Sequence, residues 1–370
     1  MTPSIEDFRR KVMETGLFGL YHSNRSKDDH WGKNCFNSSF PASLCCYLFS
    51  QNQKAMYAKA TMKDGKVISF IDTIRIQDAF NMNPSMKLTD LYFDFESIYK
   101  PFEAYTTGSI DGIDLVIREN NKDRRYLRPL EVKLTVMPDS TTFRKPETEW
   151  GCEIVIRPAT MEYIALSIFD STKEHRDTII EIFDKCCGTI QDWTSEKEIV
   201  QHIFELKNAL DLFIEIFMDF QKPLVLQTIW KTKGKEPILQ DQAFDVLFWS
   251  DMGFTRLFMS KSLIDAKNHI TRPGRAVARL ARCLWELSKM GKIDTQAIYR
   301  EMAYSKQSDK EFSVSGTAWR PIANNPRLNR LTLNKDVITK VIQPGYISKL
   351  QPERRFDQTL YYSFKEEEQK

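Results

Sequence analysis

The sequence predicts a mixed α/β protein in which helices pack on a central sheet, with an α+β arrangement as the alternative. Three observations predict it. Short runs rich in β-branched and aromatic residues alternate with helical patterns along residues 56–250. Of the 370 residues, 42% are hydrophobic and 28% are charged, which is the composition of a globular protein. No apolar run reaches the length of a membrane span, so we expect no membrane partner.

Strands and helices follow one another in an order that supports a central mixed sheet flanked by helices. The Asp64–Gly65 pair separates two alternating runs and predicts a β-hairpin over residues 56–73. The remaining expected elements are strands at 114–119, 125–136 and 152–158, a helix at 159–170, an amphipathic helix at 196–220, and strands at 223–230 and 244–251.

The seven cysteines predict free thiols. They include two adjacent pairs and no CxxC pattern, which suits neither a disulfide framework nor a zinc site, so we expect a reducing, cytoplasmic location. No HExxH, GxGxxG or Walker A pattern occurs. Zinc proteases, dinucleotide-dependent enzymes and NTP-driven motors are therefore disfavoured.

Positive charge is concentrated near the C-terminus. The net charge is only +3, but residues 272–355 hold 17 Lys and Arg against 7 Asp and Glu, which favours a polyanion partner. We therefore divide the chain into a core domain at 1–265 and a basic, largely helical region at 266–370 that contacts the polyanion, with an approximate boundary.

Two groups of arginines in the basic region are candidate DNA contacts. Helical spacing places the first group on one face of a helix, where it can track phosphates or form the solvated side of a core helix. The second group is interleaved with asparagines in a loop-like segment, and Arg and Asn are the usual partners of guanine and adenine in the major groove. An ordered surface loop is the alternative for this segment. The six residues are Arg275, Arg279, Arg282, Arg320, Arg327 and Arg330.

The clearest chemical pattern is a hairpin that carries acids where buried strands have few. If the strands "DLVIRE" and "RYLRPLEVKLTV" pair through a turn centred on residues 121 and 122, Asp114 lies opposite Pro129 and diagonal to Glu131. Strand alternation then places Asp114, Glu131 and Lys133 on one face. The acids can share a divalent cation, and the lysine can position an attacking water, so phosphodiester hydrolysis suits the cluster.

The bare pattern acid-x-Lys has little specificity, because it occurs five times in this chain. Only the copy at Glu131 lies in a β-branched run one hairpin away from a second acid-bearing strand. A surface hairpin with a solvated charged face fits these residues about as well.

The sequence around the hairpin resembles a known family. "DLVI" followed by "LEVKLT" is similar to the PD-(D/E)xK nuclease signature, with Ile113 where the signature has proline. Together with "WGKNCFNSSFP", "FDFESIYKPF" and "GCEIVIRPATMEYIALSI", these segments resemble the HindVP family of type II restriction endonucleases, over about residues 17–168.

This resemblance implies a PD-(D/E)xK core and a Mg²⁺-dependent endonuclease that cuts double-stranded DNA in a prokaryotic cytoplasm. It implies a palindromic site of the type GRCGYC and a cognate methyltransferase as functional partner. Carried over by motif, Asp114 and Glu131 become metal ligands and Lys133 the residue that positions water and charge. A palindrome cut on both strands needs two sites related by a two-fold axis, so we expect a homodimer.

Two other acids are secondary candidates. Glu96 is expected on a helix before the hairpin, where related enzymes keep an additional acid, and a surface carboxylate is its alternative role. Asp111 is a rival to Asp114, but by the proposed register it lies beyond the strand.

Two other functions remain open. One is a catalytically inactive DNA-binding protein on a nuclease scaffold, which would be favoured if the carboxylates of Asp114 and Glu131 lay too far apart to share a metal. The other is a repair or structure-selective nuclease that uses the same site without sequence preference.

Overall fold

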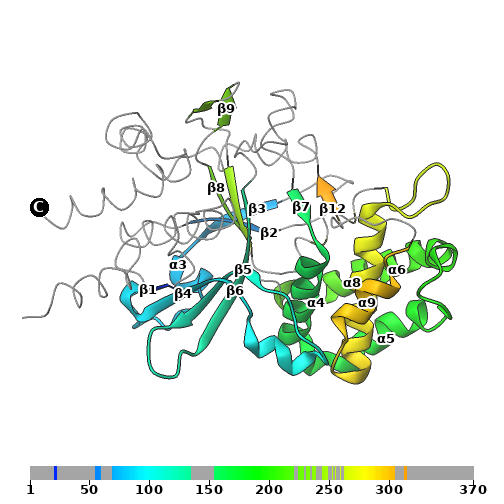
Figure 1. The fold of residues 1–370 in the computed structure, drawn as a ribbon, viewed down its shortest axis with the longest axis horizontal. Helices are drawn as coiled ribbons and strands as arrows, with labels where there is room; N and C mark the ends of the chain where they lie inside the picture. The colour runs from blue at the N-terminus through cyan, green and yellow to red at the C-terminus, as the bar shows by residue number, and fades with distance from the viewer. Residues whose placement is uncertain are drawn as a thin grey trace, which may run out of the picture.

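The computed structural model describes residues 21–22, 55–59, 69–134, 154–220, 224–228, 231–233, 236–238, 244–248, 252, 255, 259, 262–304 and 312–314. These residues form one large sheet and a group of helices gathered at one end of it (Figure 1). The arrangement is a mixed α/β fold, as the sequence predicts.

The large sheet has eight strands in the order β1-β4-β5-β6-β11-β8-β2-β3. In that order the strands are β1 (Tyr21–His22), β4 (Leu91–Ser97), β5 (Ile113–Glu119), β6 (Tyr126–Leu134), β11 (Phe244–Phe248), β8 (Leu224–Thr228), β2 (Ala55–Lys59) and β3 (Ser69–Ile74). Strands β1 and β4 pair in parallel and the other neighbours pair antiparallel, so the sheet is mixed. Two small antiparallel pairs join β9 (Lys231–Lys233) to β10 (Glu236–Ile238) and β7 (Ile154–Ile156) to β12 (Phe312–Val314).

Several predicted elements are confirmed. The hairpin expected over residues 56–73 is the antiparallel pair β2–β3, and the acid-bearing hairpin is the pair β5–β6. The strand expected at 152–158 contains β7, and the helix that follows it is α4 (Pro158–Thr172).

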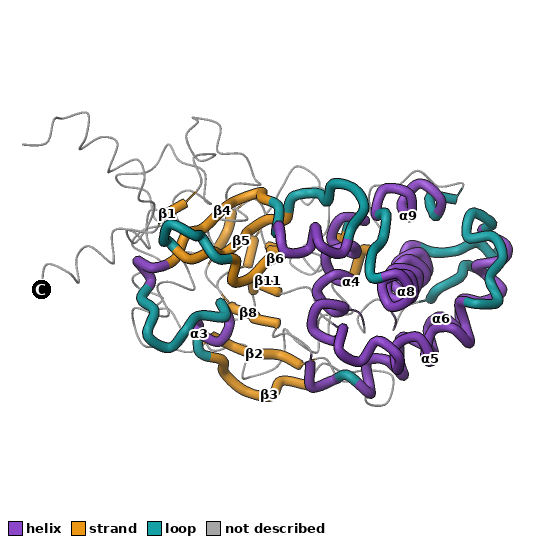
Figure 2. Tube along the Cα trace, turned by 90° about the horizontal axis from the view of Figure 1, so that it is seen from below, coloured by secondary structure: helices purple, strands orange, loops and turns teal. Residues whose placement is uncertain are grey.

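Helices α4, α5 (Arg176–Cys187), α6 (Glu196–Ile216), α8 (Arg272–Met290) and α9 (Thr295–Glu301) gather at one end of the sheet. The short α3 (Ile76–Ala79) lies apart from them, and short 3-10 turns include η4 (Lys100–Tyr105). Helix α8 packs against α4, α5 and α6 and lies among them in Figure 2. The helix begins at a Thr271 cap whose hydroxyl accepts the Gly274 amide at 3.2 Å, and ends at Gly291 with φ of 74°. Local sequence therefore sets both ends of the central helix.

One hydrophobic core joins the helices to the sheet. It runs from Phe102 in η4 to Met302 after α9, and it includes Val116 of β5. Side chains from both sides of residue 265 contribute to it among the residues that the structure describes, and the division at 265/266 stays a prediction.

Within the described ranges, the structure contains no helix of the length and apolar character needed to cross a bilayer.

Candidate active site

The β5–β6 hairpin contains a one-residue β-bulge. The paired residues are Leu115–Leu130, Val116–Pro129 and Ile117–Arg128, followed by Arg118–Tyr126, which leaves Leu127 as the extra residue. The expectation that Asp114 lies opposite Pro129 is wrong, because the structure pairs Pro129 with Val116. The turn is longer than expected, and the sequence alone did not reveal its length.

Continued by one residue beyond the Leu115–Leu130 pair, the observed register places Asp114 opposite Glu131. Both acids then lie on the face of the Val116–Pro129 pair, two positions away from it. Directly opposed residues in antiparallel strands have Cβ atoms about 5 Å apart. Asp114 is half-buried and Glu131 is 7% exposed. This register brings the two positions closer together than the diagonal relation predicted from the sequence.

The bulge decides which face Glu131 occupies. At the turn end, the guanidinium of Arg118 lies 4.9 Å from the centre of the Tyr126 ring, so these two residues share the face of Asp114. Counted in steps of two from Tyr126 without a bulge, that face would hold Leu130 and not Glu131. One extra residue shifts the alternation and brings Glu131 to the side of Asp114.

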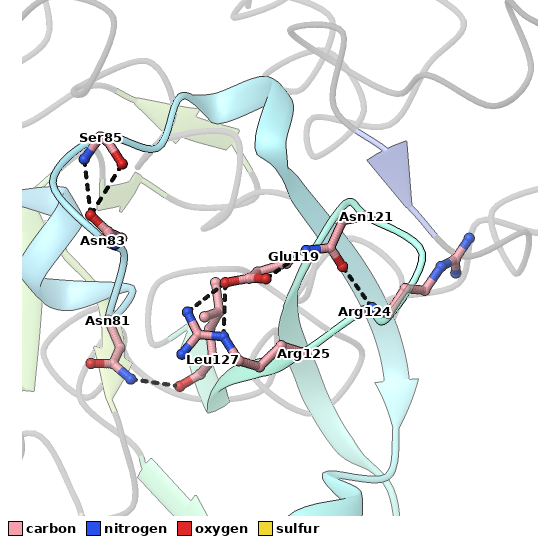
Figure 3. Close-up of polar contacts among 8 residues, drawn as sticks. All are labelled: Asn81, Asn83, Ser85, Glu119, Asn121, Arg124, Arg125 and Leu127. Carbon is pink, nitrogen blue, oxygen red and sulfur yellow. Dashed lines mark hydrogen bonds and ion pairs between the residues drawn. The ribbon is translucent and has the colours of Figure 1, made fainter.

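Polar contacts fix the turn end of this hairpin (Figure 3). Glu119 accepts hydrogen bonds from Arg125 Nε at 2.8 Å and Asn121 Nδ2 at 2.7 Å. The bond from Arg125 lowers the pKa of Glu119, so this carboxylate stays charged. Asn81 Nδ2 donates to the carbonyl oxygen of Leu127, the bulge residue, at 3.3 Å.

Glu96 lies in β4 and not on a helix, so that expectation is wrong. The residues before and after it pair with Leu115 and Ile113, which places its backbone opposite Asp114. Three acid positions therefore stand in one row across β4, β5 and β6. The side chain of Glu96 lies outside what the structure describes.

Lys133 lies in β6, two positions after Glu131, and its backbone pairs with Val246 of β11. Strand alternation gives it the same face position as Glu131. Its side chain also lies outside the described part of the chain, so its role stays a prediction.

The first two turns of α4 form hydrogen bonds with β6 and with the segments that flank β5 and β4. Thr160 Oγ1 donates to Glu131 Oε1 at 2.9 Å, and both side chains are buried. Tyr163 Oη donates to the backbone carbonyl of Asp111 at 2.8 Å, just before β5, and accepts the amide of Tyr99 at 3.2 Å, just after β4. Neither Thr160 nor Tyr163 is a candidate from the sequence, because both residue types are common in helices that pack on a sheet.

A second group of charges lies beside the row. Glu162 of α4 is 7% exposed, and burial raises its pKa to about 7. The carboxylate of Asp111 adds to that rise, the guanidinium of Arg279 opposes it, and Asp294 adds a smaller rise. Glu162 was missed in the sequence, although an acid inside the apolar run "MEYIALSI" is a recognisable signal.

Asp111 is exposed and precedes β5, as expected for the rival to Asp114. It contributes its backbone carbonyl to Tyr163 and its charge to the surroundings of Glu162. The row of acid positions therefore contains Asp114 and not Asp111.

The donor set of the row suits a hard divalent cation. Opposed Asp and Glu carboxylates offer the oxygen ligands that Mg²⁺ prefers, and an adjacent acid position can add another. Among the described side chains, no group of three or more His, Cys, Asp or Glu is placed to hold a metal ion. The assignment of Asp114 and Glu131 as metal ligands stays a prediction.

The first group of arginines is buried, which corrects the expectation that it tracks phosphates on a helix surface. Arg275, Arg279 and Arg282 are 3%, 1% and 8% exposed. Arg282 Nε lies 2.7 Å from Glu286 and its Nη2 lies 2.5 Å from Glu301. These guanidinium groups are held inside because α8 is enclosed by other helices.

The second group, Arg320, Arg327 and Arg330, lies outside the described residues. Its assignment to base contacts stays a prediction.

Comparison with known proteins extends the resemblance over nearly the whole chain. The family model described as HindVP restriction endonuclease matches residues 31–366. The type II restriction enzyme HgiDI of Herpetosiphon aurantiacus is 34% identical over 352 residues, which cover 95% of this chain and 96% of that protein. The probable type II restriction enzyme HindVP of Haemophilus influenzae is 31% identical over 350 residues, 94% of this chain and 93% of the relative.

No solved structure matches this chain. The PD-(D/E)xK core therefore stays a prediction from the motif of the hairpin, whereas family membership rests on similarity along the chain. The resemblance noted in the sequence is confirmed, and the chain belongs to the HindVP restriction endonuclease family.

Proposed function

We propose that this chain is a type II restriction endonuclease that cuts both strands of DNA at a short palindromic site in a Mg²⁺-dependent reaction. Family membership over residues 31–366 supports the class of enzyme. The observation that carries the chemistry is the β5–β6 register, which ends at the Leu115–Leu130 pair and, continued by one residue, sets Asp114 opposite Glu131. This opposition also counts against an inactive scaffold, which we associated with widely separated carboxylates.

Asp114 and Glu131 are the residues that hold the metal, and Glu96 is the adjacent acid that can complete the set. When bound, Mg²⁺ activates water, polarises the phosphoryl oxygen and offsets the charge that develops on it. Lys133 positions the attacking water and stabilises that charge from the neighbouring strand position. The PD-(D/E)xK core is the scaffold that we assign to this arrangement.

DNA recognition is assigned to the basic C-terminal region. Arg320, Arg327 and Arg330 contact bases in the major groove, because guanidinium groups pair with guanine edges. We expect a degenerate six-base palindrome of the type GRCGYC, a cognate methyltransferase that protects it, and a cytoplasmic homodimer. A dimer supplies two copies of the row, one for each strand of the palindrome.

A plasmid digest tests the proposal. Unmethylated plasmid is incubated with wild type, Asp114→Asn, Glu131→Gln or Lys133→Ala, with Mg²⁺ or with EDTA. Asp111→Asn is the matched control, because it makes the same change three residues away and outside β5. We expect discrete, Mg²⁺-dependent bands from wild type and Asp111→Asn, and a loss of at least about 100-fold in rate for the other three variants.

The other outcomes separate the alternatives. DNA binding without cleavage by wild type would establish an inactive scaffold. Cleavage of junctions or damaged DNA without discrete plasmid bands would establish a structure-selective nuclease. Cleavage that survives Asp114→Asn but not Asp111→Asn would move the site to the rival acid.

A further inference from the structure

We propose that Thr160 is a positioning residue for the metal-binding carboxylate of Glu131, and that the first two turns of α4 hold the row of acids in register. This inference rests on the proposed function, because it concerns the same site. It is carried by three hydrogen bonds that join one helix to β6, to the segment just before β5 and to the segment just after β4.

The Thr160 bond fixes the direction of the Glu131 side chain. Its hydroxyl donates to Oε1 at 2.9 Å, and the two side chains are 4% and 7% exposed. An ionised carboxylate only accepts hydrogen bonds, and a hydrogen bond to a charged group is about twice as strong as a neutral one. With one oxygen held by the hydroxyl, rotation of the carboxylate about its last bond is restricted.

The position of Thr160 in α4 adds to this effect. Pro158 opens the helix, so Thr160 lies in its first turn. The hydroxyl that holds Glu131 therefore projects from a regular helix and not from a loop.

Tyr163 ties the same helix to the other two strands of the row. It is 1% exposed, and its hydroxyl bridges the carbonyl of Asp111 before β5 and the amide of Tyr99 after β4. Asp114 lies three residues after one of these contacts and Glu96 three residues before the other. A rigid helix thus fixes the strand ends from which the acid side chains project.

Partners of metal ligands commonly change metal affinity by about 10–100-fold when they are removed. We therefore expect Thr160→Val, which keeps the shape and removes the hydroxyl, to weaken divalent-metal binding by about that factor. Thr160→Ser keeps the hydroxyl and should bind metal within about 3-fold of wild type.

Thr172→Val is the matched control. Thr172 lies in the same helix, is fully buried, and donates its hydroxyl to the Ile168 carbonyl at 2.8 Å, far along α4 from the row. This variant removes a buried threonine hydroxyl from α4 without touching Glu131. It should lower thermal stability and leave metal binding unchanged.

The experiment measures Mn²⁺ binding to the full chain by electron paramagnetic resonance, without DNA, and the Mg²⁺ concentration for half-maximal plasmid cleavage. Both are recorded for wild type, Thr160→Val, Thr160→Ser, Thr172→Val and Glu131→Gln, with thermal unfolding of each. The positioning role would be supported if Thr160→Val binds Mn²⁺ more weakly than wild type. Thr160→Ser and Thr172→Val should both bind Mn²⁺ about as tightly as wild type.

Two results would overturn it. The first is equal Mn²⁺ binding by Thr160→Val and Thr172→Val. The second is Mn²⁺ binding by Thr160→Ser that is as weak as that of Thr160→Val. Either result would show that the hydroxyl does not orient the ligand. Failure of the proposed function would give a different result from failure of the Thr160 proposal. In that case Glu131→Gln would bind Mn²⁺ as tightly as wild type and would show the same cleavage as wild type.

Discussion

The side-chain amide of Asn81 donates a 3.3 Å hydrogen bond to the carbonyl oxygen of Leu127, the extra residue of the β6 bulge. A bulge disrupts the ladder locally, so its backbone groups need partners outside the strand pair. Asn81 itself has φ of 58°, a left-handed conformation that asparagine and glycine tolerate better than other residues. This contact links α3 and its following turn to the hairpin that carries Asp114 and Glu131.

Replacement of Asn81 should separate the hydrogen bond from the backbone strain. Asn81→Gly keeps the left-handed backbone and loses the bond, which should lower the free energy of unfolding by about 1 kcal/mol. Asn81→Ala should cost about 1 kcal/mol more, because alanine is strained at positive φ. Urea unfolding of both variants measures the difference; equal stability of Asn81→Gly and wild type would show that the bond contributes nothing.

Glu162 should make stability fall as pH rises. Its pKa is about 7 in the folded protein against an ordinary value of 4.5, so the folded state holds this proton more tightly than the unfolded state. The stability that follows is fully present below pH 4.5 and is lost as pH rises through about 7, with a total of about 3 kcal/mol.

Urea unfolding between pH 4.5 and 8 checks this for wild type and Glu162→Gln. We expect the difference in unfolding free energy between them to change across that range in favour of the variant, because glutamine does not titrate. Glu181→Gln in α5, which removes an exposed carboxylate, is the control and should follow wild type. A pH-independent difference between wild type and Glu162→Gln would contradict the prediction.

Arg282 should act through stability and not through DNA affinity. Its guanidinium pairs with Glu286 and Glu301 and lies 5.3 Å from the centre of the Trp193 ring. Arg282→Ala removes a buried guanidinium and leaves the half-buried carboxylate of Glu286 without this partner, which should lower the free energy of unfolding by about 3 kcal/mol.

The salt dependence of DNA binding distinguishes the two roles. A phosphate contact contributes a slope of about 0.9 per charge, so the folded Arg282→Ala variant should keep the wild-type slope. Arg300→Ala on α9 removes an exposed arginine and serves as the stability control. A slope reduced by about one charge in Arg282→Ala would restore the phosphate role that its burial argues against.

Tyr163→Phe should weaken both the fold and the site. The change leaves the Asp111 carbonyl and the Tyr99 amide without the bridging hydroxyl, at a cost of about 1–3 kcal/mol in unfolding free energy. Because these contacts hold the strand ends of the acid row, cleavage at 25 °C should also fall at saturating Mg²⁺.

Tyr105→Phe is its control. The hydroxyl of Tyr105 donates to Asp170 at 2.7 Å, near the other end of α4. We expect its loss to affect stability alone. Equal cleavage rates for Tyr163→Phe and Tyr105→Phe would contradict the link between α4 and the site.

Local sequence determined much of this protein. Strand alternation and the caps of α8 each depend on neighbouring residues, and the observed elements follow them. The pair β2–β3 also confirms the predicted hairpin, although Asp64 and Gly65 lie outside the described residues. The choice of Asp114 over Asp111 also follows from local pattern, because the first lies within β5 and the second lies before it. The family could be identified from quoted segments alone.

Tertiary structure decided what brings distant residues together. The bulge at Leu127 sets the register that places Asp114 opposite Glu131, and a loop length cannot be inferred from the strand pattern on either side. Helical spacing alone shows that the arginines of α8 share a face but not what covers that face. Arg279 lies against Tyr299 and donates to the Met302 carbonyl, and Arg282 contacts Glu301 and Trp193, so α9 and the segment before α6 bury them. The contact of Thr160 with Glu131 also depends on tertiary structure. The two residues are 29 positions apart, and no periodic pattern in the sequence relates them.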